Sequence, residues 1–386
     1  MDLNTLLLRA IELDASDVHL KVGQPPVLRR DGALGPMDGI SALEESHLEG
    51  ILDIVTRSNP KRRALFDETG DLDISYMVGG RRFRVNGFRQ RGAISFAFRI
   101  IPAEVPNFDQ LGLPGGVRRL ANEHRGLVLV TGATGSGKTT TLAAMIDSMN
   151  QSRRQHIVTV EDPIEIIHRD KGCIVNQREV GLDTESFQQA LRRVLRQDPD
   201  VILIGELRDT ETAWTAVQAA ESGHLVFATL HTLDAAETLG RMIEFFPAEK
   251  QQQIRSILAG VLRGVISQRL LPTIRGGRVA AVEVMVSNAR VADLIREARS
   301  DEIEDAIAAG EFYEMQTFMQ ALIQLVLAGR VDEDTAANAA TNRHDFLVAL
   351  DTAKKERAAD EREAAQAKAA ENGTGPAVES LGAALR

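Results

Sequence analysis

Cysteine, long apolar runs and an excess of positive charge are all missing from this sequence. The single cysteine among 386 residues is Cys173, which excludes an internal disulfide framework and any zinc site built from several thiolates. Nowhere do about 18 consecutive apolar residues occur, the length that a membrane-spanning helix needs. A formal net charge of −10 has the wrong sign for a general nucleic-acid coat. These absences count against disulfide-rich, membrane-spanning and nucleic-acid-binding proteins.

The remaining composition is that of an average globular protein, with 44% hydrophobic and 26% charged residues. The first residues carry acids where a secretory signal peptide needs a basic head and a sustained apolar stretch, so we expect no signal peptide. A reduced cysteine fits a reducing compartment. We therefore expect a folded cytoplasmic protein whose contact with any membrane is peripheral and whose partners do not include nucleic acid.

Residues 1–101 have the pattern of a small α+β domain. A short amphipathic helix is followed by segments in which apolar and polar residues alternate, as in strands with one buried face. The expected strands are Asp17–Leu20, Val27–Arg30, Leu72–Met77, Arg82–Phe88 and Ile94–Ile100. Prolines and glycines crowd residues 102–116 and are expected to break any regular element there. This segment is therefore predicted to be a linker between domains.

After residue 116, continuous apolar runs alternate with helical patterns, which is typical of a parallel α/β sheet. The runs predict four strands lying side by side, at Gly126–Thr131, His156–Glu161, Val201–Gly205 and Leu225–Leu230. Beyond about Ser287 the pattern is almost entirely helical. We expect this second unit to cover 117–350. Residues 351–386 offer almost nothing to bury, so a frayed helix running into a disordered tail is expected there.

A phosphate-binding loop follows the first of these runs. Residues 132–139 match the pattern G-x-x-x-x-G-K-[ST], with an apolar strand before them and a helix after them. Glycines let successive backbone N–H groups face the phosphates, and the helix N-terminus adds a partial positive charge. The expected nucleotide-binding residues are Gly132, Ala133, Thr134, Gly135, Ser136, Gly137, Lys138, Thr139 and Thr140.

Two residues of this loop have specific expected roles. The Lys138 ammonium would reach the β- and γ-phosphates, and the Thr139 hydroxyl would bind Mg²⁺. The predicted cofactors are therefore ATP and Mg²⁺.

Two further strand ends offer carboxylates for the chemistry. Glu206 follows the strand at Val201–Gly205, and Glu161 ends the strand at His156–Glu161. Open α/β sheets place their ligands at this edge. We hypothesise that Glu206 acts on the attacking water and that Glu161 helps to hold Mg²⁺. The alternative for Glu161 is a solvated turn in which the next residue, an aspartate, caps the chain before proline.

Histidines bracket the strand at Leu225–Leu230. A single histidine at a strand end is more often structural than functional, and a metal site would need further ligands in register. The functional alternative is that His231 donates to the γ-phosphate and reports its loss, while His224 orients the neighbouring acids.

The motifs around the phosphate loop resemble the secretion ATPases, and most closely the type IV pilus retraction ATPases of the PilT/PilU type. The motifs after the loop are Glu161–Glu165, Asn176–Val180, Arg196–Asp200, Ile204–Asp209 and Gly223–Thr232, and those before it are Ala15–Leu20, Gly23–Pro26 and Arg82–Asn86. In family terms, 159–165 is similar to the Asp box, 201–206 to an atypical Walker B segment and 223–232 to the His box. Gly205, where many P-loop ATPases carry an acid, is thereby typical of the family.

The resemblance implies an α/β fold with a PAS-like N-terminal domain over 1–101 and a RecA-like ATPase domain with a helical C-terminal part over 117–350. It implies a hexameric ring of identical chains, in which arginines contribute across the nucleotide site. The candidates are Arg84, Arg99 and Arg208, because a guanidinium stabilises the charge that gathers on phosphate oxygens in the transition state. The alternative is that these are ordinary surface arginines.

The same resemblance places the chain at the cytoplasmic face of the inner membrane. The implied partner there is a pilus platform protein of that membrane, and a paralogous pilus ATPase is a further candidate. The implied activity is ATP hydrolysis that drives pilus retraction and twitching motility.

Two alternatives to a retraction motor stay open. Pilus assembly and type II secretion ATPases usually carry a larger N-terminal region and a four-cysteine zinc motif, whereas this chain has only Cys173. A regulatory ring subunit with low turnover is the other alternative, although intact Lys138 and Glu206 count against it. Between the PilT and PilU types the sequence does not decide. Ala292 stands where the retraction family has an arginine, so the family's role for that helix is in doubt.

Overall fold

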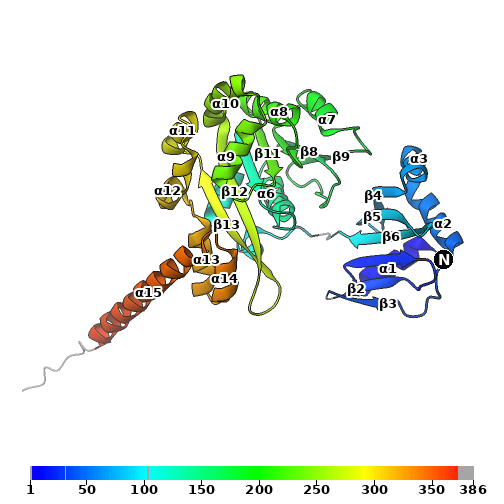
Figure 1. Cartoon of the computed structure of the whole chain (residues 1–386), viewed down its shortest axis with the longest axis horizontal. Coiled ribbons are helices and arrows are strands. Elements are labelled where there is room, and N and C mark those ends of the chain that lie inside the picture. Colours follow the sequence, from blue (N-terminus) through cyan, green and yellow to red (C-terminus); the bar gives the residue numbers. More distant parts are fainter. Residues whose placement is uncertain (1, 31, 102–103, 373–386) are drawn as a thin grey trace, which may run out of the picture.

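The structure, a computed structural model, describes residues 2–30, 32–101 and 104–372. Those residues form two separate β-sheets that follow one another along the chain, and a group of helices after the second sheet (Figure 1). The predicted α/β fold class is confirmed. None of the helices in the described ranges is both long and apolar enough to cross a membrane.

The first sheet has six antiparallel strands in the order β3-β2-β1-β6-β5-β4. Its strands are β1 (Asp17–Lys21), β2 (Val27–Arg30), β3 (Ala33–Pro36), β4 (Asp71–Val78), β5 (Arg81–Gln90) and β6 (Ala93–Ile100). The helices α1 (Leu3–Glu12), α2 (Glu45–Thr56) and α3 (Pro60–Thr69) accompany it. Along β5, Phe83 and Val85 are fully buried while Arg82, Arg84 and Asn86 alternate with them, so the sheet has one apolar face and one polar face.

Five of these strands match the predicted segments, but α2, α3 and β3 were not predicted. The α2 signal was present as apolar residues at Leu48, Ile51, Leu52 and Val55, which are buried at helical spacing. For α3 the signal was Asn59 before Pro60, an N-cap followed by proline at the first helical position. The flanking segments, in which apolar and polar residues alternate, indicated strands more clearly, so neither helix was predicted.

The predicted linker contains regular structure, contrary to expectation. Within 104–116 lie the short helix α4 (Phe108–Leu111) and the start of α5 (Gly115–Ala121). Asn107 and Gln110 form a reciprocal capping box at the start of α4, and Gly112 in the left-handed conformation ends it. The proline and glycine positions therefore set the ends of short helices instead of preventing them. Residues 102–103 lie outside the described residues.

The second sheet has seven strands in the order β13-β12-β7-β11-β10-β8-β9. All neighbours run parallel except β12 and β13, which form an antiparallel pair. The strands are β7 (Gly126–Thr131), β8 (His156–Glu161), β9 (Ile174–Glu179), β10 (Val201–Ile204), β11 (Leu225–Leu230), β12 (Leu262–Pro272) and β13 (Arg278–Val286). The connecting helices are α6 (Lys138–Ser152), α7 (Phe187–Val194), α8 (Thr210–Glu221), α9 (Ala235–Glu244) and α10 (Ala248–Val261).

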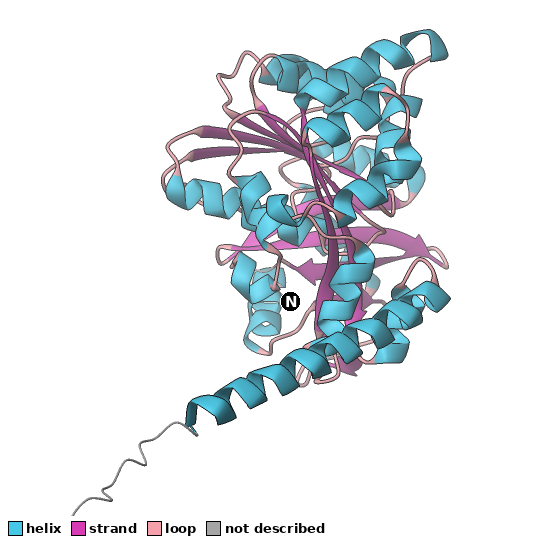
Figure 2. Cartoon of the chain, turned by 90° about the vertical axis from the view of Figure 1, so that its left-hand side faces the viewer, coloured by secondary structure: helices cyan, strands magenta, loops and turns pink. Residues whose placement is uncertain are grey.

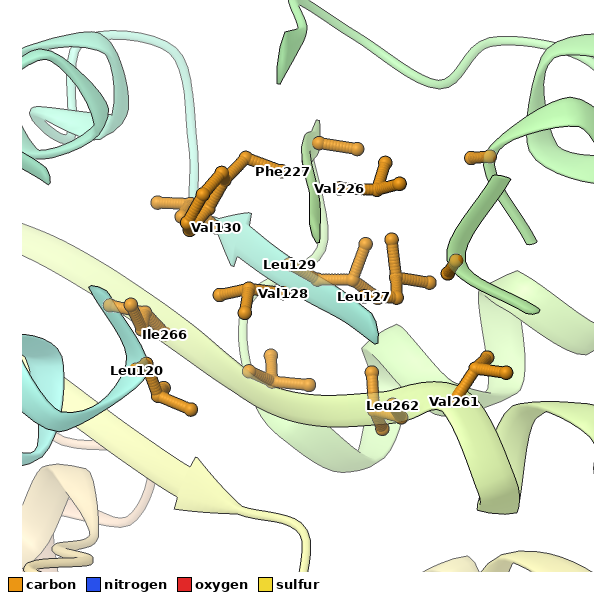
Figure 3. Close-up of a cluster of buried hydrophobic side chains, with 14 of the residues drawn as sticks. Leu120, Leu127, Val128, Leu129, Val130, Val226, Phe227, Val261, Leu262 and Ile266 are labelled. Carbon is orange, nitrogen blue, oxygen red and sulfur yellow. The ribbon is translucent and has the colours of Figure 1, made fainter. Parts of the chain in front are cut away.

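The four predicted strands β7, β11, β10 and β8 do lie side by side, which confirms that prediction. Figure 3 shows why β7 is central: Leu127, Val128, Leu129 and Val130 lie between β11 and β12 and are fully buried. A strand covered on both faces needs a continuous apolar run, and this is the pattern that the sequence contains. The outer strands β9, β12 and β13 were not predicted. Strand β9 is half exposed, whereas β12 and β13 are largely buried.

Helices dominate the described residues after Ser287, as predicted for that region. They are α11 (Ala289–Arg296), α12 (Ile303–Ala308), α13 (Phe318–Leu327), α14 (Glu333–Ala339) and α15 (Arg343–Asn372), with 3-10 turns at Ser300–Glu302 and Glu311–Tyr313. Figure 2 shows α15 projecting away from the body as one helix. Residues 351–372 of the predicted tail lie in this helix, and 373–386 lie outside the described residues.

Glu283 on β13 is a buried acid inside the second unit, with 5% of its surface exposed. Its Oε1 accepts a hydrogen bond of 2.8 Å from the backbone N–H of Ala235 at the start of α9. Burial raises the pKa of Glu283 from 4.5 to about 7, partly offset by that hydrogen bond. Because the folded-state pKa lies above the unfolded one, the associated stability is present below about pH 4.5 and is lost as the pH rises towards 7.

We expect Glu283→Gln to keep the hydrogen bond from Ala235 and to remove this pH dependence. Between pH 6 and pH 8 the variant should gain roughly 1.5 kcal/mol in the free energy of unfolding relative to the wild type. Urea unfolding followed by the fluorescence of Trp214 measures the difference at both values. Glu311→Gln, at an exposed acid that is not among the charges acting on Glu283, is the matched control. If the free energy of unfolding changed with pH equally in Glu283→Gln and in the wild type, the raised pKa of Glu283 would be contradicted.

Candidate functional site

The phosphate loop joins β7 to α6, as the sequence predicted. At Gly132, φ is 137° and an added Cβ would lie 2.4 Å from the carbonyl oxygen of Gln268 on β12. Gly137 has a φ of 97° and forms the N-cap of α6. Only glycine fits both positions, the first because backbone lies too close and both because φ is positive. The loop therefore bends sharply from the end of β7 into the N-terminus of α6.

Lys138 lies inside this loop with 9% of its surface exposed. Its Nζ donates hydrogen bonds to the carbonyl oxygens of Gly132 at 2.7 Å and Ala133 at 3.0 Å. Burial lowers the pKa of Lys138, while the carboxylates of Glu206 and Glu165 act to raise it. The ammonium is thus held within the loop by the two carbonyl oxygens. Thr139 and Thr140, in the first turn of α6, are partly exposed.

Glu206 lies just beyond the end of β10 and contacts two other predicted residues. Its Oε2 accepts from Arg208 Nε at 2.8 Å, and its Oε1 lies 3.2 Å from His231 Nε2. Burial acts to raise the pKa of Glu206, but the hydrogen bonds and charges of Arg208 and His231 outweigh it and leave the pKa lowered. Glu206 is therefore a carboxylate at neutral pH, which is the form that accepts a hydrogen bond from water.

Glu161 ends β8, beside Glu206 in the sheet. Its Oε1 accepts from Thr159 Oγ1 at 2.6 Å and from Gln177 Nε2 at 3.1 Å. Burial raises the pKa of Glu161, and these hydrogen bonds act in the opposite direction. A nearby cation would favour the charged form of such a carboxylate. Glu161 is not the solvated turn of the alternative interpretation, because its carboxylate is bonded to two side chains.

A cavity of about 540 Å³ opens beside Glu206. Its walls combine the ends of β10 and β11 with one side of α9, and they include Arg208, His231, Glu237 and Arg241. Charged side chains of the lining come both from the carboxyl edge of the sheet and from α9, and apolar residues lie among them. Within the part of the chain that the structure describes, no three His, Cys, Asp or Glu side chains converge as a metal-ion site.

The two predicted arginines of the first sheet lie directly opposite one another, Arg84 on β5 and Arg99 on β6. Arg84 NH2 pairs with Asp73 at 2.7 Å, and Arg99 Nε donates to Asp17 at 2.9 Å. The hydrogen bond that Arg84 donates to Asp73 raises the pKa of Arg84, and the carboxylates of Glu165 and Asp162 add to the rise. The polar face of the first sheet thus turns towards the Asp box of the second unit.

The prediction for His224 is wrong. Its Nδ1 lies 3.0 Å from both Ser222 Oγ and the carbonyl oxygen of Ala219, at the end of α8. His224 precedes β11 and His231 follows it, so the length of the strand, about 20 Å, separates them. His224 therefore lies at the edge of the sheet away from the acids and cannot orient them.

Three residues that connect the two sheets were missed as site residues. Arg82 and Ser75, on the polar face of the first sheet, both contact Glu179 at the end of β9. Arg82 and Glu179 belong to motifs already singled out in the sequence, at Arg82–Asn86 and Asn176–Val180. Membership in these motifs was the one sequence signal for Arg82 and Glu179. The spacing of the motifs does not show that the two residues contact one another.

Comparison with known proteins identifies the family. The family model described as "Type II/IV secretion system protein" matches residues 82–342. The type IV pilus retraction ATPase PilT of Pseudomonas aeruginosa is 45% identical over 348 residues, covering 90% of this chain and all of that protein. The type IV pilus ATPase PilU of the same organism is 40% identical, covering 91% of each chain.

A solved structure agrees with these sequence relatives. The crystal structure of the pilus retraction motor PilT with bound ADP superimposes with a TM-score of 0.83 at 45% identity, covering 89% of this chain and 98% of that one. The polar edge built from the phosphate loop, Glu161, Glu206 and His231 therefore belongs to a fold shared with that motor. This chain is a member of the type II/IV secretion ATPase family, of the PilT/PilU type.

Proposed function

We propose that this chain is an ATP-hydrolysing motor that powers type IV pilus retraction, and with it twitching motility, by domain motion coupled to ATP turnover. The observation that carries the proposal is the convergence of Lys138, Glu206 and His231 at one edge of the parallel sheet. The full-length similarity to PilT and PilU supports the pilus role. The ADP bound by the solved PilT supports nucleotide binding at the equivalent loop.

ATP would bind through residues 132–140. The backbone N–H groups of the loop and the α6 N-terminus would hold the phosphates, and Lys138 would exchange its two carbonyl partners for phosphate oxygens. A phosphate beside Lys138 would oppose the effect of burial on its pKa. Binding would therefore favour the charged lysine.

Mg²⁺ suits the oxygen donors at this edge. The Thr139 hydroxyl and the Glu161 carboxylate are hard oxygen ligands, and Mg²⁺ bound with a nucleotide takes only one or two carboxylates. When bound, the ion would neutralise charge on the phosphates.

Glu206 would orient and deprotonate the attacking water, while His231 would sense the γ-phosphate. Their contact at 3.2 Å gives a direct route by which loss of the phosphate would alter the environment of the base. Arg84 and Arg99 would contribute positive charge from the N-terminal domain, 1–101, to the nucleotide between the domains. Arg208, bonded to Glu206, would hold that carboxylate in place.

The working assembly would be a homo-hexamer at the cytoplasmic face of the inner membrane. Its partner would be the pilus platform protein in that membrane, with a paralogous pilus ATPase as a second candidate, supported by the similarity to both PilT and PilU. Residues 102–116 would serve as the hinge between the N-terminal domain and the ATPase domain, 117–350.

Glu206→Gln is expected to lower kcat for ATP at least about 100-fold, because it removes a general base while keeping size and hydrogen bonding. Lys138→Ala should abolish nucleotide binding as well as turnover. Purified proteins would be compared by phosphate release and by nucleotide affinity. The control is Glu244→Gln, an acid on the far wall of the same cavity. Full turnover in Glu206→Gln would remove Glu206 from this role, and an ATP-bound wild-type ring without hydrolysis would favour the regulatory subunit.

Arg84→Ala is expected to lower kcat by one to three orders of magnitude while the assembled ring forms, since an arginine that meets transition-state charge acts on turnover. Native mass should show six subunits in both the variant and the wild type. Arg30→Ala, at an exposed position of the same sheet, serves as the control. Normal hydrolysis by assembled Arg84→Ala would exclude this residue, and a stable monomer under turnover conditions would exclude the ring.

A strain that lacks the gene is expected to keep surface pili and to lose twitching motility. Retraction is then the missing step, because pili are still assembled. Electron microscopy of pili and a twitching assay on agar measure the two properties. Complementation with wild type should restore movement, and complementation with Lys138→Ala should not. A strain without surface pili would support an assembly motor instead.

A further inference from the structure

Glu179 is a carboxylate shared by the two units of the chain. From the polar face of the first sheet, Ser75 Oγ donates to its two oxygens at 3.1 and 3.0 Å, and Arg82 forms an ion pair with it. From its own unit, the backbone N–H of Ile164 donates to Oε2 at 3.1 Å. The Arg82 and Glu179 side chains are 10% and 5% exposed, so this contact is nearly dry.

The contact between the units continues past Glu179. Asn59 Nδ2, at the start of α3, donates to the carbonyl oxygen of Gly181 at 3.2 Å. Arg82 NH2 also donates to Ser75 Oγ at 2.6 Å, so the two N-terminal partners of Glu179 hold one another. A buried charge pair is tolerated where most of its remaining hydrogen-bonding capacity is used. These bonds use that of the Glu179 carboxylate, while Arg82 Nε stays buried without a hydrogen-bond partner. The first sheet is therefore fixed to the end of β9 by a defined polar contact.

The loop at 162–168 is attached to the same strand. Gln177 Nε2 donates to the carbonyl oxygen of Ile166 at 2.8 Å, and its Oε1 accepts from the N–H of His168 at 2.8 Å. With the bond from Ile164 to Glu179, alternate residues of the loop are pinned to β9 by two side chains.

This loop carries two acids, Asp162 and Glu165, whose charges act on residues of the candidate site. The carboxylate of Glu165 acts on Lys138, and both Glu165 and Asp162 act on Arg84. Asp162 also lies 4.0 Å from Arg208. A change in the position of Ile164 would move these charges relative to the phosphate loop.

We propose that Glu179 is a positioning residue that transmits the position of the N-terminal sheet to the 162–168 loop. While the sheet is docked, Arg82 and Ser75 fix the carboxylate that holds Ile164. When the sheet moves away, the carboxylate loses these donors and becomes exposed to water, which competes with the Ile164 N–H for its oxygens and weakens the hold on Ile164. The loop is then ordered only when the two units are in contact.

The coupling predicts an effect at a distance, which hydrogen exchange measures in the full chain. Arg82→Ala is expected to speed amide exchange in the 162–168 segment about ten-fold, the loss of one charge-assisted hydrogen bond. Arg63→Ala is the matched control, because Arg63 also forms ion pairs with several acids but only inside the N-terminal unit. It should leave the 162–168 segment unchanged. This readout needs neither a pilus nor ATP turnover.

Turnover provides the second readout and rests on the proposed ATPase function. Arg82→Ala and Glu179→Gln should lower kcat five- to twenty-fold while KM for ATP stays within about two-fold, since the phosphate loop itself is untouched. Arg82→Lys should recover part of the kcat, because it restores the charge without the planar fork. Ser75→Ala, which removes a single neutral donor, should show a smaller change of the same kind and stands in if Arg82→Ala does not assemble.

Unchanged exchange at 162–168 in an assembled Arg82→Ala protein would overturn the proposal. Faster exchange spread evenly over the whole N-terminal unit would also overturn it, by showing a loss of stability instead of a coupling. If exchange at 162–168 responds as expected but no variant or wild type hydrolyses ATP, the coupling stands and the proposed function fails.

Discussion

Parallel pairing of β7 with β11 and β12 is the constraint on which the site depends. Because parallel strands all end at one edge, the residues that follow β7, β8, β10 and β11 meet there although they are far apart in the sequence. Lys138, Glu161, Glu206 and His231 come from four such ends. The continuous apolar run of β7 makes this possible, since it fills the centre of the sheet.

Burial at this edge sets the electrostatics of the individual groups. It lowers the pKa of Lys138 and raises that of Glu161, so each charge there needs an opposite partner. Glu206 differs because Arg208 and His231 hold it ionised. An anion bound at this site would stabilise the charged ammonium, and a cation bound with it would stabilise the charged carboxylates. A nucleotide with Mg²⁺ has that charge pattern.

The first sheet contributes through its polar face. Alternation along β4 and β5 buries Phe83 and Val85 on one side and presents Ser75, Arg82 and Arg84 on the other. The exposed face of an antiparallel sheet is usually left to solvent, but here it meets the Asp box and β9. Residues that would be ordinary surface arginines in an isolated domain become part of the contact between the two units.

Sequence reasoning was most accurate where a local pattern has one physical explanation. The strand at Gly126–Thr131, the glycines at 132 and 137 and the helix after them were all predicted, because a buried parallel strand and a phosphate-binding turn each demand a particular run of residues. It failed for α2, α3, β3 and the outer strands β9, β12 and β13, and for His224. The histidines before and after a strand give the same sequence signal. The direction of the strand in the sheet decides which of the two reaches the site.

The sequence by itself determined the phosphate loop, the apolar strands around it and the carboxylates that follow them, since these depend on neighbours within a few residues. Only the tertiary structure decided that Glu206 contacts His231 and that Arg82 meets Glu179, about a hundred residues further along the chain. Such contacts depend on strand order and on the docking of one sheet against another. Both are set by the packing of the whole chain, which leaves no trace in the spacing of any single motif.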